Sequence, residues 1–168
     1  FDDNTGNAIS TEALGRALKQ ASDAINHRID LYGSDACLMS MAEVAAEMTD
    51  SVDVFAGSEE VEPAAGWPYD YVLRRWAEKP GATPSEVATI LTEEYVKSYT
   101  GGSNGTRGAT FSALNLSKLP AFNQAITVLG KKIQALEPAD KKKVLAAADY
   151  TQSYSYSDYG DVVDFITK

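Results

Sequence analysis

The chain has 168 residues, of which 44% are hydrophobic and 23% are charged, a composition that suits a folded domain and excludes a disordered or low-complexity protein. No run approaches the ~18 uninterrupted apolar residues of a membrane-spanning helix. Fifteen Lys and Arg against 24 Asp and Glu leave a net charge of −9, which disfavours binding to nucleic acid or to an anionic membrane and favours binding to cations or basic peptides.

Helix-type and strand-type segments alternate along the chain. Helical spacing of apolar residues predicts a helix over 11–26, and alternation predicts a strand over 28–33. The same reasoning predicts helices over 38–48, 69–78, 84–98 and 118–136 and after Pro138, and strands over 52–57 and 109–116. The alternation favours an α/β fold with a mainly parallel sheet. Because an average sheet has about five or six strands, we expect the N-terminal strands to be missing from this chain.

One helix has a clear start signal. Thr83, Pro84 and Glu86 form a capping box with proline at the first helical position, so the helix that begins here is predicted to run to about residue 98.

Cys37 is the only cysteine, and its position favours a chemical role. It follows the strand over 28–33 by four residues and stands at the start of the predicted helix over 38–48. Functional groups gather at the carboxyl edge of open α/β sheets, and a helix N-terminus stabilises negative charge. A thiolate is the nucleophilic form of cysteine. We therefore interpret Cys37 as a nucleophile, with a buried, small hydrophobic residue as the alternative.

Several short motifs follow one another from residue 33 onward. GSDACLM at 33–39 and EVA at 43–45 come first. GSEE, EP, GWPY and ATFSALNLSK follow at 57–60, 62–63, 66–69 and 109–118. In this order they resemble the clostripain family of cysteine peptidases, over about residues 1–168 and most specifically at 33–69. The resemblance implies a caspase-like α/β/α sandwich in which 1–168 form a single, incomplete peptidase domain.

The resemblance also implies a cysteine endopeptidase with a Cys–His dyad. Cys37 would attack the peptide carbonyl while a histidine moves the proton, and the backbone N–H of Cys37 would help to stabilise the oxyanion. Asp35 would bind the Arg or Lys side chain before the scissile bond. The alternative for Asp35 is a residue that turns the chain after the strand.

Acidic residues after the next predicted strand are further candidates for the substrate cleft. Glu60 is the residue that we assign to substrate binding, within a cluster of Glu59, Glu60 and Glu62; solvated loop charges are the alternative. The family tends to carry an acidic residue where this chain has Ala64 and Ala65. That departure predicts a broader or weaker preference for basic residues.

The only histidine, His27, is not expected to be the base. The strand from residue 28 to 32 places it about 16 Å from the cysteine along the strand, far beyond a hydrogen bond of about 3 Å. By the resemblance, the catalytic histidine lies upstream and would fall just before Phe1. We therefore expect a partner N-terminal chain or segment to supply it, with Phe1 at or near a site of autoprocessing.

Cofactors and location complete the expectations. One cysteine and one histidine argue against a zinc site. The segment DDNTGN, with Asp2 as a first ligand, is oxygen-rich, but Asn7 and Ala13 stand where an EF-hand needs Gly and Glu. We expect no required cofactor and calcium only as an optional ligand. The resemblance implies a bacterial protein that is secreted or in the cell envelope and acts on peptides. The alternative is a catalytically inactive caspase-like module that binds basic peptides or calcium.

Overall fold

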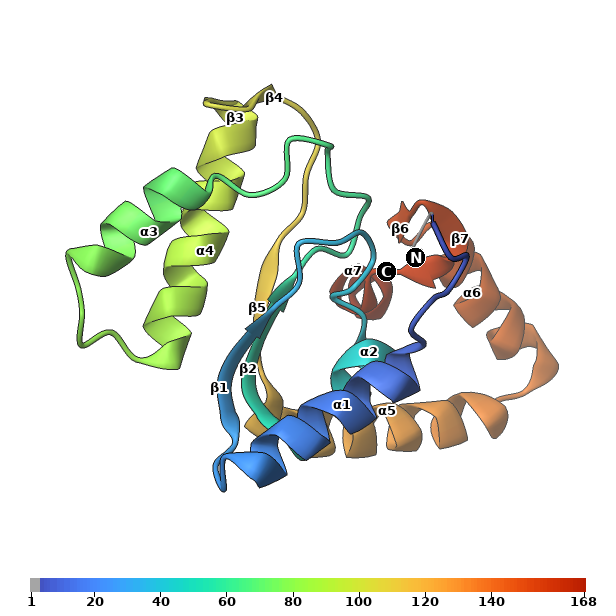
Figure 1. Ribbon diagram of the computed structural model, residues 1–168. Helices are drawn as coiled ribbons and strands as arrows, with labels where there is room; N and C mark the ends of the chain where they lie inside the picture. The colour runs from blue at the N-terminus through green and yellow to red at the C-terminus, as the bar shows by residue number, and fades with distance from the viewer. Residues whose placement is uncertain (1–3) are drawn as a thin grey trace. The chain divides into compact units, whose positions relative to one another are not determined.

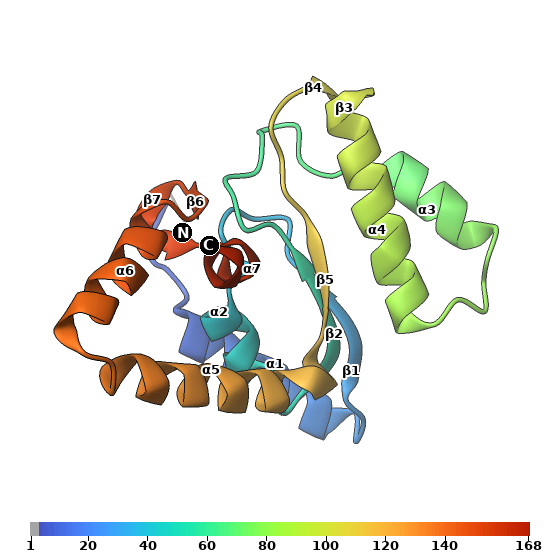
Figure 2. The ribbon, with the colours of Figure 1, turned by 180° about the vertical axis from the view of Figure 1, so that it is seen from behind.

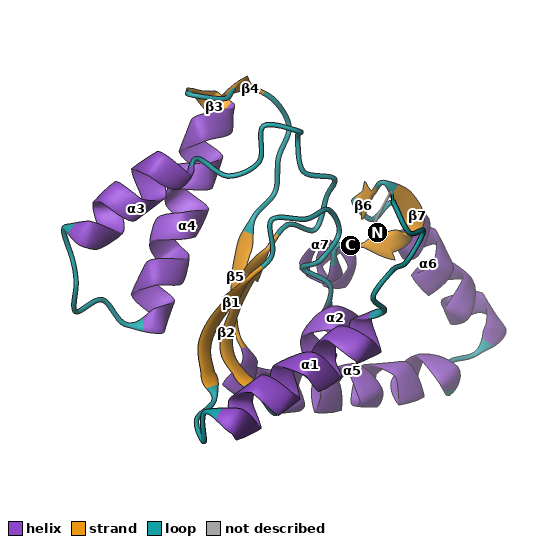
Figure 3. Ribbon diagram, viewed as in Figure 1, coloured by secondary structure: helices purple, strands orange, loops and turns teal. Residues whose placement is uncertain are grey.

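The computed structural model describes residues 4–168 and divides into two compact units, Phe1–Leu119 and Pro120–Lys168. Helices and strands alternate through the first unit (Figures 1 and 3). The α/β fold class predicted from the sequence is thereby confirmed. Within the described residues, no helix combines the length and the apolar character that a membrane span requires.

A three-stranded sheet with the order β1-β2-β5 forms the centre of the first unit. β1 (Ile29–Gly33) runs parallel to β2 (Val52–Gly57). β5 (Ser112–Asn115) runs antiparallel to β2. All three predicted strands are therefore present, and the third is shorter than its apolar pattern predicts. The β1–β2 pair is the parallel part of the sheet, and its two strands end at the same edge.

Helices cover both faces of this sheet (Figures 1 and 2). α1 (Thr11–Ala24) and α2 (Ala42–Glu47) lie on one face, where α1 contacts α2 and β1. α3 (Tyr69–Ala77) and α4 (Pro84–Tyr99) lie on the other, where α4 contacts all three strands. Because β2 is covered on both sides, five of its six residues are buried. This is the α/β/α layering that the family resemblance implies.

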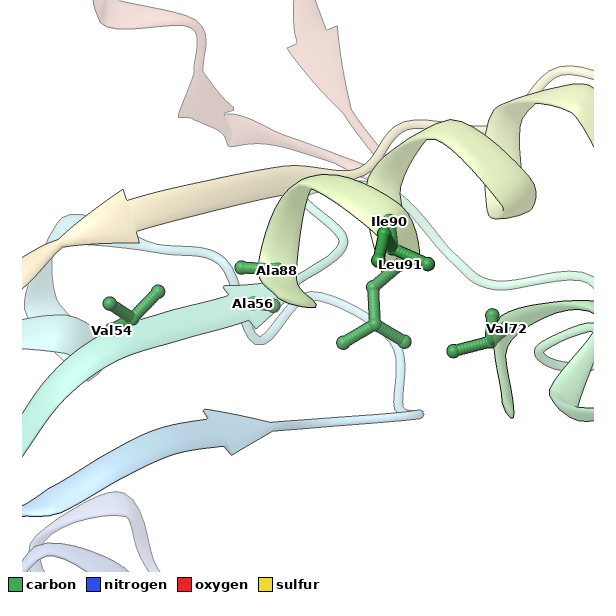
Figure 4. Packing of buried hydrophobic residues seen from close by; sticks show 6 residues of the cluster. All are labelled: Val54, Ala56, Val72, Ala88, Ile90 and Leu91. Carbon is green, nitrogen blue, oxygen red and sulfur yellow. The ribbon is translucent and has the colours of Figure 1, made fainter. Parts of the chain in front are cut away.

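A hydrophobic core cluster lies between α4 and the sheet (Figure 4). Its buried members are Val54, Ala56, Val72, Ala88, Ile90 and Leu91. Leu31, Trp67 and Phe111 are partly buried and pack against this cluster. Full burial of one large aliphatic side chain contributes about 1.5–3 kcal/mol, so this cluster anchors α4 firmly against β2.

The capping box predicted at the start of α4 is present. The Thr83 side chain accepts a hydrogen bond from the backbone N–H of Glu86 (3.3 Å), and the Glu86 carboxylate accepts one from the N–H of Thr83 (2.8 Å). Lys79 donates a further hydrogen bond to that carboxylate (2.9 Å). The Lys79 bond first, and then the bonds from Thr83, lower the pKa of Glu86 to about 2. This cap fixes the residue at which α4 begins.

The remaining elements are shorter or belong to the second unit. A hairpin of β3 (Thr100–Gly102) and β4 (Gly105–Thr106) occupies the loop predicted over 100–108, and η1 (Leu116–Lys118) follows β5. α5 (Leu119–Gln134) leads into the second unit. That unit also contains α6 (Pro138–Asp149), a hairpin of β6 (Ser153–Tyr154) and β7 (Tyr156–Gly160), and α7 (Val162–Thr167).

A substitution at Gly15 in α1 tests how closely α1 packs against α2. A Cβ atom at this position would lie 2.5 Å from the backbone oxygen of Glu47, so Gly15→Ala must push the two helices apart. We expect the free energy of unfolding of the intact protein to fall by about 1–3 kcal/mol, measured by chemical denaturation. Gly130→Ala in α5, where nothing lies within 4 Å of an added Cβ, is the control and should gain up to about 1 kcal/mol. Equal effects of the two changes would contradict the close approach.

Candidate active site

The loops that follow β1 and β2 run together at the carboxyl edge of the parallel pair. The backbone N–H of Leu38 donates to the carbonyl of Glu60 (3.3 Å). The backbone N–H of Ser40 donates to the carbonyl of Ser58 (2.9 Å). Residues that are 22 and 18 positions apart in the sequence are thereby held in contact, at the edge where α/β proteins gather their functional groups.

Cys37 lies in a turn four residues beyond β1, and its side chain is exposed. The prediction that it stands at the start of a helix is wrong, because α2 begins only at Ala42. Leu38, the next residue, has a φ of 62°, a left-handed conformation that does not continue a helix. The turn therefore presents the thiol directly at the sheet edge, without a helix N-terminus behind it.

A backbone amide, and not a helix N-terminus, contacts the Cys37 sulfur. The N–H of Glu62 donates a hydrogen bond to the Cys37 sulfur (3.3 Å). The sulfur is thus tied to the loop that follows β2 rather than to α2.

Asp35 is exposed, two residues before Cys37, and is held by the loop that follows β2. Its carboxylate accepts hydrogen bonds from the hydroxyl of Tyr69 (2.7 Å) and from the backbone N–H of Trp67 (3.4 Å). Burial, and then the hydrogen bond to Asp35, raise the pKa of Tyr69 to about 12. At Gly66, where φ is +61°, an added Cβ would lie 3.1 Å from the Asp35 carboxylate. The carboxylate therefore has a defined orientation beside the cysteine.

A second carboxyl group lies next to Asp35, and it belongs to Glu62 rather than Glu60. Glu62 is only 9% exposed, and one of its carboxyl oxygens accepts a hydrogen bond from the indole N–H of Trp67 (3.4 Å). Burial first, and then the carboxylate of Asp35, raise the pKa of Glu62 to about 8. The Glu60 carboxylate instead accepts a hydrogen bond from the backbone N–H of Val61 (2.7 Å).

Aromatic side chains support this group of residues. Trp67 packs edge-on against Phe111, with ring centroids 5.3 Å apart. Tyr99 at the end of α4 and Asn104 in the β3–β4 hairpin both donate to the carbonyl of Gly66 (2.8 and 3.2 Å). The sequence-based reasoning missed Tyr99 and Asn104, because they lie more than thirty residues from the loop that they hold and no local motif links them.

His27 lies at the opposite end of β1 from Cys37, where it is exposed and 3.8 Å from the carboxylate of Asp30. The five residues of β1 separate the two side chains, as the sequence predicts. The sequence contains no other histidine. Asp2, the first ligand in the calcium hypothesis, lies outside the described residues. Among residues 4–168, no group of three or more His, Cys, Asp or Glu is placed to hold a metal ion.

The chain is an α/β/α protein with an exposed thiol at the carboxyl edge of two parallel strands. Acidic side chains lie beside this thiol, which makes it a candidate nucleophile. The model of the Clostripain family matches residues 1–168. The chain therefore belongs to the clostripain family. The resemblance inferred from the motifs is confirmed. No curated protein matches the chain.

Solved structures share the same fold. A clostripain from Bacteroides thetaiotaomicron, in complex with the peptide inhibitor BTN-VLTK-AOMK, is 18% identical with a TM-score of 0.70, over 99% of this chain and 67% of that one. A secreted cysteine protease from the same organism, in complex with an irreversible peptide inhibitor, is 25% identical with a TM-score of 0.58, over 71% and 34%. A B. fragilis cysteine protease is 20% identical with a TM-score of 0.55, over 71% and 48%. The chain thus spans about half or less of the last two.

Gly33, the last residue of β1, tests how Trp67 forms the site. A Cβ atom here would lie 2.8 Å from the Trp67 ring. We expect Gly33→Ala to displace the indole from Glu62 and to lower the free energy of unfolding by about 1–3 kcal/mol. Near-ultraviolet circular dichroism and denaturation of the intact protein measure both effects. Gly81→Ala, where an added Cβ meets nothing within 4 Å, is the control. An unchanged aromatic spectrum in Gly33→Ala would contradict this packing.

Proposed function

We propose that this chain is the nucleophile-bearing part of a cysteine endopeptidase that cleaves after Lys or Arg. Cys37 is the nucleophile and Asp35 binds the basic side chain of the substrate. The observation that carries the proposal is the exposed Cys37 thiol, hydrogen-bonded to a backbone N–H (3.3 Å) beside an oriented carboxylate. Membership of the clostripain family supports the same chemistry.

In this proposal the thiolate of Cys37 attacks the substrate carbonyl carbon. The new S–C bond forms as the carbonyl oxygen takes up negative charge, which the backbone N–H of Cys37 helps to stabilise. Collapse breaks the C–N bond, and a histidine gives its proton to the leaving amine. Water then hydrolyses the thioester. A thiol and an imidazole supply all the groups for these steps, so we propose that the reaction requires no metal; calcium as an optional ligand stays a prediction.

The histidine must come from outside the described residues, because His27 lies at the wrong end of β1. We propose that an N-terminal chain or segment supplies it and that the two parts separate by autoprocessing. Secretion or attachment to the bacterial cell envelope is part of the same proposal. Two of the structurally similar proteases from Bacteroides thetaiotaomicron are described as secreted.

The preference for basic residues follows from charge. Asp35 is the exposed carboxylate nearest to Cys37 in the sequence, and Tyr69 and the N–H of Trp67 fix its orientation. A carboxylate held in this way pairs well with an ammonium or a guanidinium group. In the peptide inhibitor of the similar clostripain from Bacteroides thetaiotaomicron, lysine is the last residue of the peptide.

Asp35→Asn tests the role of this carboxylate in the full-length, processed protein. Loss of a charge-assisted hydrogen bond costs about 1.5–3 kcal/mol, so kcat/KM for Lys and Arg substrates should fall about 10- to 150-fold. A norleucine substrate should lose much less. Both are measured with fluorogenic peptides that differ only in the residue before the scissile bond. Equal losses on all substrates would assign Asp35 a structural role.

A second experiment separates the enzyme from a catalytically inactive binding module. A peptidyl acyloxymethyl ketone that ends in Lys should label Cys37 much faster than it labels a free thiol of similar exposure, and Cys37→Ala should remove both labelling and peptide cleavage. Mass spectrometry locates the label. Labelling at the rate of a free thiol, with no cleavage of any peptide, would favour the binding module.

A further inference from the structure

We propose that Thr110 is a positioning residue for the nucleophile: its hydroxyl group holds the loop that follows β2 in the conformation in which this loop contacts Cys37. The inference rests on the proposed peptidase function and adds a residue that acts through the loops of the active site. Thr110 belongs to the motif at 109–118, to which the proposed reaction assigns no role.

The antiparallel pairing of β5 with β2 places Thr110 beside the active site. Ser112, the first residue of β5, lies opposite Gly57, the last residue of β2. The residues just before β5 therefore lie at the carboxyl edge of β2, next to the loop that begins at Ser58. Thr110 contacts this loop from a segment that lies 50 to 52 residues further along the chain.

The Thr110 hydroxyl makes three hydrogen bonds with three consecutive residues of the loop. Its oxygen accepts from the backbone N–H of Glu59 (3.1 Å) and from that of Glu60 (3.0 Å). It also forms a hydrogen bond with the hydroxyl of Ser58 (3.0 Å). A threonine hydroxyl has one hydrogen to donate and two lone pairs that accept, so these three bonds use its whole capacity.

The direction of the bond between the two hydroxyls follows from their hydrogens. The Ser58 side chain is fully buried, and its hydroxyl donates to the carbonyl of Glu60 (3.0 Å). That bond uses the single hydrogen of Ser58, while the two N–H groups occupy both lone pairs of Thr110. Thr110 is therefore the donor to Ser58. A continuous chain of hydrogen bonds runs from Thr110 through Ser58 to the Glu60 carbonyl.

The Glu60 carbonyl connects this chain of hydrogen bonds to the loop of the nucleophile. It also accepts from the backbone N–H of Leu38 (3.3 Å), the residue after Cys37. Leu38 has a φ of 62°, a conformation that is uncommon for a bulky residue and persists where surrounding contacts hold it. Two residues beyond Glu60, the N–H of Glu62 donates to the Cys37 sulfur (3.3 Å). The loop that Thr110 holds thus contacts both the sulfur and the residue that follows it.

The loop depends on such contacts because residues 58–62 belong to no helix or strand. Without the Thr110 hydroxyl, two backbone N–H groups lose their acceptor in a partly buried place, and the loop must shift for them to reach water. That shift moves the Glu60 carbonyl and the Glu62 N–H, which hold the turn at Cys37. A misplacement of about 1 Å can lower a rate about 100-fold, so we expect the loss of this hydroxyl to slow the reaction.

Thr110→Val tests the inference in the full-length, processed protein, because valine has the shape of threonine without the hydroxyl. Active sites are first titrated with a peptidyl acyloxymethyl ketone that ends in Lys, so that the assay counts only molecules that react. We expect kcat per titrated site to fall about 10- to 100-fold, by the same factor for a lysine and a norleucine peptide. Thr110→Ser keeps the hydroxyl and should restore most of the rate.

Thr92→Val is the matched control. Thr92 is also partly buried, and its hydroxyl donates to the carbonyl of Ala88 within α4 (2.9 Å). The same atoms are removed there, and kcat per titrated site should not change. A merely structural residue alters the number of folded molecules and not the rate of each. An unchanged kcat per titrated site in Thr110→Val, or an equal loss in Thr92→Val, would therefore contradict the inference.

Ser58→Ala keeps the inference testable if Thr110→Val does not fold. It removes the hydroxyl between Thr110 and the Glu60 carbonyl but leaves both backbone N–H groups paired with Thr110. We expect kcat per titrated site to fall about 2- to 10-fold, as for the loss of one neutral hydrogen bond. An unchanged rate would overturn the role of Thr110 but not the peptidase. No cleavage and no labelling of Cys37 in the unchanged protein would overturn the peptidase itself.

Amide hydrogen exchange measures the connection between Thr110 and the nucleophile directly. The N–H groups of Leu38 and Glu62 should exchange faster in Thr110→Val than in Thr110→Ser, although neither group donates to Thr110. The faster exchange reports the shift of the loop, because both groups have partners across the two loops. Equal exchange of the Glu62 N–H in the two variants would show that the loop contacts Cys37 without the Thr110 hydroxyl, against the inference.

Discussion

The parallel pairing of β1 with β2 is the constraint on which the site depends. Parallel strands end at the same edge, so the loop that carries Asp35 and Cys37 leaves the sheet beside the loop that carries Glu62. Backbone hydrogen bonds between the loops continue the pairing beyond the strands. The contact between the Glu62 N–H and the Cys37 sulfur (3.3 Å) is the last of these links. Without the parallel register, the thiol and the acidic side chains would not meet.

The same constraint brings two carboxyl groups together in a partly buried place. Asp35 is exposed and accepts hydrogen bonds from Tyr69 and Trp67. Glu62 is buried, and burial first and then Asp35 raise its pKa to about 8. Two carboxyl groups that lie close together do not both ionise readily. In the proposed function, a positively charged side chain of the substrate pairs with Asp35 at this place. The two carboxyl groups therefore support the proposed preference for basic residues.

Much of the fold follows from local patterns. The strands over 28–33 and 52–57 and the capping box at Thr83 are confirmed, because alternation and capping are properties of a few neighbouring residues. The predicted start of a helix near Cys37 was wrong, because Leu38 adopts a left-handed conformation there. The loop that contains Leu38 instead forms backbone hydrogen bonds with the loop that follows β2. Helical spacing in 38–48 does not reveal that long-range pairing. The burial of the Glu62 side chain could not be predicted for the same reason.

The sequence by itself determined the α/β class, the family, the place of Cys37 after a strand and the separation of His27 from Cys37 by that strand. These conclusions depend on residue order and on the length of one strand. Only the tertiary structure decided which glutamate turns inward, what holds the sulfur, and how Tyr99 and Asn104 support the loop at Gly66. Burial and hydrogen-bond partners arise from contacts between segments far apart in the chain, and no local pattern encodes them.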